Sequence, residues 1–411
     1  MGIAEAARDL RARVEALPGM ERLLAALVGA PPAYLVGGAV RDLLLGADSV
    51  DLDVAVEGDA RATARQLAAR LGGEATEHER FGTATVTEKG LTVDLAGTRR
   101  ERYERPGALP QVEPASLDED LARRDFTVNA MAVALSGDEL GELRDPHGGL
   151  GDLEAATIRV LHPASFVDDP TRLLRAVRYE ARLGFAMDQR TEALAREAAE
   201  AGALSTVSGP RVRDELLDLL AETERGIAVA RLAELGLDQA LHPALRSDAE
   251  LVASASLGSA DTGADPALTG LAALVHGSPE RLVPWLDHLN LPKVERDAVA
   301  RAAEEADDVV RALRTEPSPA ELHTLLSREP PEALALALGL GAPGEPVLRY
   351  LADLREVKLE ISGDDLVAAG VPESPVLGRA LEETLRRKLN GEVAGPEEEL
   401  RLALRLAEEM R

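Results

Sequence analysis

The stretch YLVGGAVRDLLLGADSVDLDVAV, residues 34–56, places a glycine pair and two aspartates between apolar runs. Its pattern predicts a strand over 34–37, a helix over 39–45 and a second strand over 50–56. A glycine pair between a strand and a helix lets backbone N–H groups approach an anion, and the start of a helix favours phosphate. Gly37 and Gly38 could therefore bind a phosphate together with Arg41, or they could form only a tight turn.

The two aspartates, Asp51 and Asp53, are two residues apart, so on a strand their side chains share one face. Two carboxylates that close are unfavourable unless a cation lies between them. Oxygen ligands of this kind suit Mg²⁺, which also keeps phosphate and water as ligands. Asp94, in the apolar stretch LTVDL at 91–95, could supply a third carboxylate. The alternative is that Asp51 and Asp53 are only exposed charges at a strand edge.

The rest of the chain predicts an α+β fold, in which an N-terminal head with a mixed sheet and helices precedes an all-helical extension. In the head we expect helical structure over 3–30, a helix from Asp59 to about Leu71, a hairpin of 81–87 and 91–95, a mobile loop over 103–120 and a strand over 126–135. Helical patterns follow Pro170 to the end, and residues 254–268 resemble a low-complexity linker.

Composition narrows the possible functions. The 411 residues contain no cysteine and carry a formal charge of −27. That charge argues against a non-specific nucleic-acid binder, although arginines clustered at 99–105 and 172–182 leave room for a local basic groove. The N-terminus is not a signal peptide, and no apolar run is long enough for a membrane helix. We therefore expect a cytoplasmic protein that does not enter membranes; its oligomeric state is not indicated.

A glycine turn followed within about fifteen residues by a carboxylate pair is the layout of a nucleotidyltransferase. The chain resembles the bacterial-type (class II) tRNA nucleotidyltransferases and the related poly(A) polymerases, most closely a CCA-adding enzyme without an HD domain. The resemblance continues through ARRDFTVNAMAV (122–133), DPHGGLGDLEAATIRVLHP (145–163), DDPTRLLRAVRYEARLGF (168–185) and, more weakly, ISGDDLVAAGVPESPVLG (361–378). It implies a catalytic head over 1–160, a neck over 161–235, a body over 236–350 and a tRNA-binding tail over 351–411.

The resemblance also implies site roles. Arg124 would contact the nucleotide, although an Arg–Asp surface pair is the alternative. Asp169 and Arg172 would read the base, and Arg175 and Arg178 would support the nucleotide. An ionised aspartate only accepts hydrogen bonds and an arginine only donates them, which matches the amine and bare ring nitrogen of cytosine and adenine. Asp168 stands where the family usually has glutamate, and the sequence Asp-Asp-Pro is also a natural helix start.

The implied reaction is Mg²⁺-dependent addition of C, C and A to the 3′ end of tRNA from CTP and ATP, without a nucleic-acid template. Members that add only two cytidines are shortened where this chain has residues 103–120, so we expect full CCA addition. The alternatives are an A-adding or CC-adding enzyme, a poly(A) polymerase or, in another class, a non-catalytic tRNA-binding factor. In the tail, Arg386, Arg387 and Lys388 form a small basic cluster, which could contact tRNA or belong to a solvated helix face.

Overall fold

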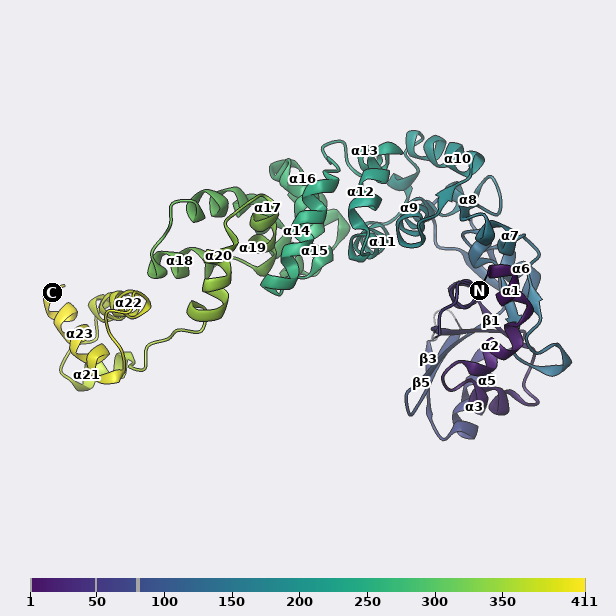
Figure 1. Cartoon of the computed structure of the whole chain (residues 1–411), viewed down its shortest axis with the longest axis horizontal. Coiled ribbons are helices and arrows are strands. Elements are labelled where there is room, and N and C mark those ends of the chain that lie inside the picture. The colour runs from purple at the N-terminus through teal and green to yellow at the C-terminus, as the bar shows by residue number, and fades with distance from the viewer. Residues whose placement is uncertain (1, 49, 79–81, 411) are drawn as a thin grey trace. The chain divides into compact units, whose positions relative to one another are not determined.

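The computed structural model describes residues 2–48, 50–78 and 82–410. These residues form two compact units, one reaching to Glu215 with Glu234–Leu241 added, the other made of Leu216–Ala233 and the chain from His242 onward. All strands in the described residues belong to the first unit, drawn from purple to blue-green in Figure 1, and the second unit is helical. The predicted α+β class is confirmed. The finer division into head, neck, body and tail stays a prediction.

The first unit is built on a seven-stranded mixed sheet. Neighbouring strands in this sheet are antiparallel, except that β2 and β5 pair in parallel. The strands in spatial order are β3 (Glu74–His78), β4 (Thr83–Glu88), β5 (Leu91–Gly97), β2 (Leu52–Val56), β1 (Ala33–Val36), β8 (Ala132–Ala134) and β9 (Leu143–Arg144). Because β2 and β5 run the same way, Asp53 pairs in register with Asp94.

The prediction that residues 3–30 are helical is confirmed for most of the segment, which forms three short helices. They are α1 (Ile3–Arg8), α2 (Leu10–Ala16) and α3 (Met20–Leu27). Pro18 and Gly19 separate the last two, and Gly19 has a φ of 78°, which a helix cannot continue.

Two other local predictions around the sheet are confirmed. Helix α5 (Ala60–Leu71) begins after Asp59, whose carboxylate accepts hydrogen bonds from the backbone N–H groups of Arg61 and Ala62. Strands β4 and β5 form the expected hairpin, and its turn residues Lys89 and Gly90 both have positive φ, as a two-residue hairpin turn requires. The predicted strand residue Phe81 lies outside the described residues.

The segment predicted as a mobile loop, 103–120, contains secondary structure in its second half. Strand β6 (Arg99–Arg102) pairs with β7 (Gln111–Pro114), and helix α6 (Leu117–Ala122) follows. Ser116 and Glu119 form a capping box at the start of this helix. The Ser-x-x-Glu spacing at 116–119 is the sequence signal that marks this helix start. Only residues 103–110 form an open connection.

The strand predicted over 126–135 is also shorter than expected. Residues Thr127–Asn129 form the 3₁₀ turn η1, and only β8 is extended. The Asp125 carboxylate explains the turn, because it accepts hydrogen bonds from the Phe126 N–H at 2.8 Å and from the Asn129 side chain at 3.0 Å. The β-forming side chains are buried in a turn rather than in a strand.

The remaining elements of the first unit are helices and short strands outside the sheet. They are α4 (Gly38–Leu44), α7 (Gly149–Glu154), β10 (Thr157–Ile158), α8 (Ser165–Asp168), α9 (Thr171–Leu183), β11 (Ala186–Met187), α10 (Gln189–Glu200), η3 (Ala203–Thr206) and α13 (Leu237–Leu241), with η2 (Gly137–Glu139) beside the sheet. Helix α4 follows β1 directly, and α9 supplies the predicted base-reading motif. These two helices and β2 position the site described below.

The prediction of a linker over 254–268 is wrong, because these residues form most of α14 (Ala249–Thr262) and the start of α15 (Pro266–His276). Its small residues serve close packing against α19 (Pro331–Gly339). A Cβ atom on Gly258 would lie 3.1 Å from the Ala335 carbonyl oxygen, and one on Gly339 would lie 2.6 Å from the Ala255 Cα. The low-complexity composition therefore reflects helices in close contact rather than a flexible connection.

The other helices of the extension include the segment with the basic cluster. They are α11 (Gly209–Ala221) and α12 (Arg225–Glu234), which both cross between the units, and α16 (Pro279–Leu289), α17 (Lys293–Leu313), α18 (Pro319–Leu326), α20 (Gly344–Arg349), η4 (Tyr350–Leu354), α21 (Gly363–Ala368), α22 (Pro375–Leu389) and α23 (Pro396–Glu409). None of the described helices is long and apolar enough to cross a membrane.

The basic cluster lies in the last turn of α22, and each of its members is paired with glutamate. Arg386 and Arg387 both bind Glu383. Lys388 lies 2.6 Å from Glu399, whose side chain is fully buried. These pairs occupy much of the cluster's charge, which favours a structural role for it over direct attraction of nucleic acid.

Candidate active site

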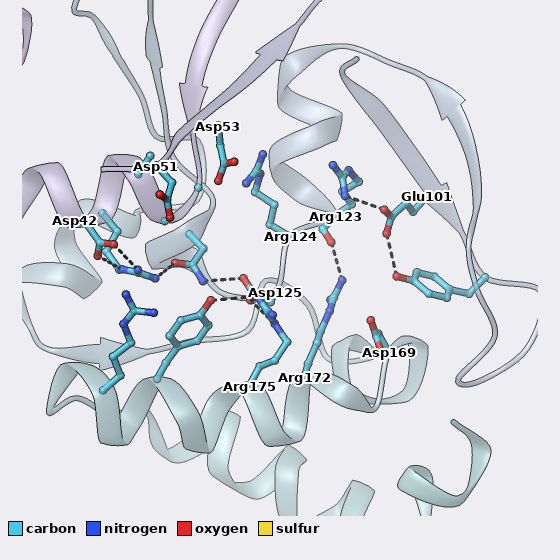
Figure 2. A pocket seen from close by; sticks show the side chains of 18 residues that line it. Asp42, Asp51, Asp53, Glu101, Arg123, Arg124, Asp125, Asp169, Arg172 and Arg175 are labelled. Atoms are coloured by element: carbon cyan, nitrogen blue, oxygen red, sulfur yellow. Dashed lines mark hydrogen bonds and ion pairs between the residues drawn. The ribbon is translucent and has the colours of Figure 1, made fainter. Parts of the chain in front are cut away.

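A cavity of about 460 Å³ opens in the first unit where the start of α4, strand β2, the segment 123–125 and helix α9 meet (Figure 2). Almost all of its lining is polar or charged. The lining residues are Gly37, Gly38, Ala39, Arg41, Asp42, Asp51, Asp53, Glu101, Tyr103, Arg123, Arg124, Asp125, Asn129, Asp169, Arg172, Arg175, Tyr179 and Arg182. Of the predicted site residues, all but Asp94 and Arg178 lie on this surface.

Gly37 shapes the cavity because it has no side chain. Its backbone has φ 71° and ψ −135°, a region that only glycine adopts readily, and a Cβ atom there would lie 2.6 Å from the Arg124 guanidinium. The Gly37 N–H donates to the Met131 carbonyl oxygen at 3.2 Å, so it is not available to an anion. The glycine pair therefore makes room for the Arg124 side chain as well as turning the chain into α4.

Asp51 and Asp53 lie as the alternation predicted. Asp51 precedes β2 and Asp53 lies within it; both are exposed, and Leu52 between them is buried. Figure 2 shows both carboxylates at the cavity, opposite the arginines of α9. Surrounding protein atoms and the nearby Asp94 and Asp51 carboxylates raise the pKa of Asp53, which Arg124 opposes only in part. A pair of repelling carboxylate oxygens fits a divalent cation.

Asp94 faces a neighbouring cavity instead. Its Oδ1 accepts a hydrogen bond from the Thr85 hydroxyl at 2.5 Å, and it lines a space of about 310 Å³ together with Asp53 and Arg124. No group of three or more potential metal-ligating side chains is found in the part of the chain that the structure describes. The protein would thus offer an ion two carboxylates and leave its other positions to phosphate and water.

Arg41 is buried and fully engaged by the protein. It donates to both Asp42 oxygens, at 2.8 and 3.0 Å, and to the Asn129 side chain at 2.6 Å, and its guanidinium lies 5.1 Å from the centre of the Tyr179 ring. Burial opposes its charge, but the Asp42 carboxylate outweighs this and raises the pKa of Arg41. Arg41 therefore links α4, η1 and α9 in addition to lining the cavity.

Arg124 is held more loosely. Its Nη2 lies 3.2 Å from the buried Asp120, and its Nε is buried without a hydrogen-bond partner in the described structure. Asp120 also binds Arg123 at 2.8 Å, so one buried carboxylate on α6 positions both arginines. Arg124 borders both cavities.

Arg175 and Asp125 form the central ion pair of the site. The Arg175 Nη2 lies 2.7 Å from Asp125, and its Nη1 lies 3.1 Å from Glu215 on α11. Although burial disfavours both charges, the pair lowers the pKa of Asp125 and raises that of Arg175. The surface Arg–Asp pair considered from the sequence does not form. Asp125 instead joins the loop after α6 to helix α9.

The predicted base-reading residues are fixed separately. Asp169 Oδ1 accepts from the Thr171 hydroxyl and from Arg211, both at 2.7 Å, so it supports the start of α9 one residue later than expected. Arg172 is buried and donates to the Ser165 hydroxyl and to the Arg123 carbonyl oxygen, both at 2.7 Å. Asp169 Oδ2 makes no hydrogen bond within the described residues, which leaves it open to a ligand.

Arg178 does not line the cavity, because its place on α9 turns it toward Glu215, 3.8 Å away. Sequence reasoning also missed several lining residues, among them Asn129, Tyr179 and Glu101. Tyr179 was detectable, because it follows Arg175 by four residues and so shares its helix face. The positions of Asn129 and Glu101 depend on the turn η1 and on strand β6, which the sequence pattern did not reveal.

A mixed sheet with a glycine turn before a helix and a carboxylate pair on the next strand defines a nucleotidyltransferase-type head. Comparison with known proteins agrees. Residues 33–159 match the poly A polymerase head domain, and residues 184–248 match a domain described as a probable RNA and SrmB-binding site of polymerase A.

Two curated relatives illustrate the similarity. The chain is 36% identical to the CC-adding tRNA nucleotidyltransferase of Deinococcus radiodurans, over 90% of this chain and 88% of the relative. It is 37% identical to the A-adding tRNA nucleotidyltransferase of Geobacter sulfurreducens, over 92% of this chain but only 45% of that longer relative.

Among solved structures, the Thermotoga maritima CCA-adding enzyme complexed with tRNA matches with a TM-score of 0.75 and 30% identity, over 98% of each chain. The chain belongs to the tRNA nucleotidyltransferase family, as its motifs predicted.

Proposed function

We propose that this protein transfers nucleotides from CTP and ATP to the 3′ end of tRNA, without a nucleic-acid template, and releases pyrophosphate. One observation carries the proposal: Asp53 and Arg124 line both the larger cavity and the smaller one beside Asp94. A nucleoside triphosphate in the larger cavity and a hydroxyl entering from the smaller would meet at the same carboxylate. This is the arrangement that a two-substrate transfer needs.

Asp51 and Asp53 are proposed to hold Mg²⁺. When bound there, the metal would activate the attacking hydroxyl and neutralise charge on the leaving pyrophosphate. Arg124 would bind the triphosphate directly, because its loosely held guanidinium borders both cavities. Gly37 and Gly38 shape the space for it, and Arg41 would contribute positive charge from a fixed position.

Base selection is assigned to Asp169 and Arg172. The unbonded Asp169 Oδ2 would accept a hydrogen bond from the exocyclic amine of cytosine or adenine, and Arg172 would donate to the adjacent ring nitrogen. Uracil and guanine present a carbonyl and a ring N–H there, so both contacts become unfavourable. Supports on Ser165 and Arg211 hold the two side chains in place. Arg175 would support the nucleotide indirectly through Asp125.

Two product ranges fit this site. Full CCA addition is supported by a pair that would accept both bases and by the length of the segment between β6 and α6. Addition of A alone is the second candidate, because the similar Geobacter relative bears that name. The similar Thermotoga enzyme is complexed with tRNA, and we propose that the helices of the second unit of this chain would hold the acceptor arm. Since tRNA and nucleoside triphosphates are cytoplasmic substrates, we place the activity in the cytoplasm.

The deciding experiment is nucleotide addition with Mg²⁺ and labelled triphosphates, on tRNAs ending before CCA, after C and after CC. Ordered addition of two cytidines and one adenosine supports full CCA addition. Addition of one adenosine only after CC supports the A-adding function, and two cytidines alone support the CC-adding function. A long adenosine tail would indicate a poly(A) polymerase, and no transfer with retained tRNA binding would indicate a non-catalytic factor.

A further inference from the structure

The cavity carries six arginines, and five of them are bound to other protein groups. Arg41 is bound by Asp42 and Asn129, and Arg175 is bound by Asp125 and Glu215. Arg123 pairs with Glu101 and Asp120, and Arg124 pairs with Asp120. Arg172 donates to the Ser165 hydroxyl and to the Arg123 carbonyl oxygen. These contacts hold the five arginines in the fold before a substrate arrives, with Arg124 held the most loosely.

Arg182 is the exception. It lies in the last turn of α9, is exposed and lines the cavity. Among the residues that the structure describes, it has no hydrogen-bond or ion-pair partner. Helical geometry explains why it faces the cavity when Arg178 does not. At 100° per residue, Arg182 lies within about 20° of Arg175 around the helix. Arg178 lies about 60° from Arg175, on the side away from Arg172.

The position of Arg182 along α9 indicates which part of a bound nucleotide it would contact. In Figure 2, Asp169, Arg172 and Arg175 succeed one another toward the side of the cavity where Asp42 and Asp51 lie. Tyr179 continues in that direction, because its ring contacts Arg41 of α4. Arg182 is ten residues beyond Arg172, which is about 15 Å along the helix axis. A nucleotide whose base is read at Asp169 and Arg172 would direct its phosphates toward this end.

We infer that Arg182 binds the terminal phosphates of the incoming nucleoside triphosphate, the part that leaves as pyrophosphate. This inference rests on the proposed function and names a residue for which the sequence motifs gave no role. The phosphates carry negative charge, opposite to that of arginine, and the guanidinium can form paired hydrogen bonds to phosphate oxygens. The smaller cavity, assigned above to the RNA hydroxyl, is not lined by Arg182, which favours the triphosphate over the RNA backbone.

The test compares Arg182→Ala, Arg182→Lys and wild type in two measurements. The first is steady-state addition with varied CTP, ATP and tRNA, including inhibition by pyrophosphate. The second is equilibrium binding of ATP and of pyrophosphate in the presence of Mg²⁺, which needs no turnover. Loss of a charged hydrogen bond at an exposed position predicts about a tenfold rise in the KM for both triphosphates and in the inhibition constant of pyrophosphate. The KM for tRNA stays unchanged, and lysine restores part of the affinity.

Arg190→Ala is the matched control, because Arg190 is an exposed arginine on α10 outside the cavity and its loss changes the net charge equally. The inference is overturned if Arg182→Ala binds ATP and pyrophosphate like wild type, if only the KM for tRNA rises, or if Arg190→Ala gives the same effect. Failure of the wild type to transfer nucleotides would count against the proposed function alone, since the binding measurement still decides the role of Arg182.

Discussion

Gly37→Ala offers a sharp test of the site geometry. An alanine at this position would have to adopt a φ of 71° with a ψ of −135°, and its Cβ would lie 2.6 Å from the Arg124 Nη1 atom. Contact at an ordinary distance begins near 3.4 Å, so the guanidinium must retreat by about 0.8 Å. The substitution thus acts on the backbone and on Arg124 at once.

The two effects have separate magnitudes. The backbone conformation costs roughly 1–3 kcal/mol of folding free energy. Displacing Arg124 from a phosphate would remove one charged hydrogen bond, about 1.5–3 kcal/mol, which corresponds to a fall in kcat/KM of about ten- to a hundredfold. The measurements are kcat/KM for CTP and ATP and the midpoint of thermal unfolding.

Gly29→Ala separates the two effects. Gly29 also has a positive φ, 75°, but an added Cβ would meet nothing within 4 Å, and the residue lies outside the active-site cavity. We expect this control to lose stability through the backbone term while keeping its kcat/KM. If Gly37→Ala also kept wild-type kcat/KM and lost only stability, the assignment of Arg124 to the triphosphate would be refuted.

Three further predictions follow from the site. Asp53→Asn should abolish transfer yet raise the thermal stability of the metal-free protein at neutral pH. Because folding raises the pKa of Asp53, the ionised carboxylate destabilises the wild type fully above the raised pKa, and the difference should disappear as the pH falls from there to the ordinary aspartate value. An unchanged difference at low pH would contradict this cause. Asp125→Ala should lower the free energy of unfolding by about 3–5 kcal/mol, because Arg175 loses its buried partner. In urea unfolding, the double variant with Arg175→Met should lose less free energy of unfolding than the sum of the two single variants. Strict additivity would rule out the coupling. Arg211→Ala should free Asp169 and increase misincorporation of UTP and GTP about fivefold, equivalent to an ion pair of about 1 kcal/mol, with partial recovery in Arg211→Lys. Unchanged selectivity in a competition assay would show that Asp169 is held without Arg211.

Local patterns in the sequence were sufficient for part of this site. The alternation around Leu52 put Asp51 and Asp53 on one face because strand geometry repeats every two residues. The three-residue spacing on α9 placed Arg172 and Arg175 together for the equivalent reason in a helix. The order of these motifs was enough to assign the family before any coordinates.

The tertiary structure decided which of these side chains remain available to a ligand. Asp125 meets Arg175 across fifty residues of sequence, and its other carboxylate oxygen accepts the hydrogen bonds from Phe126 and Asn129 that accompany the 3₁₀ turn. Asp94 lies beside Asp53 only because β2 and β5 pair in parallel. Such contacts depend on the strand order and on the approach of separate elements, whose energies no short stretch of sequence contains. For the same reason, the arginine spacing on α9 was readable from the sequence, but only the tertiary structure showed that Arg178 meets Glu215 while Arg182 has no hydrogen-bond or ion-pair partner among the described residues.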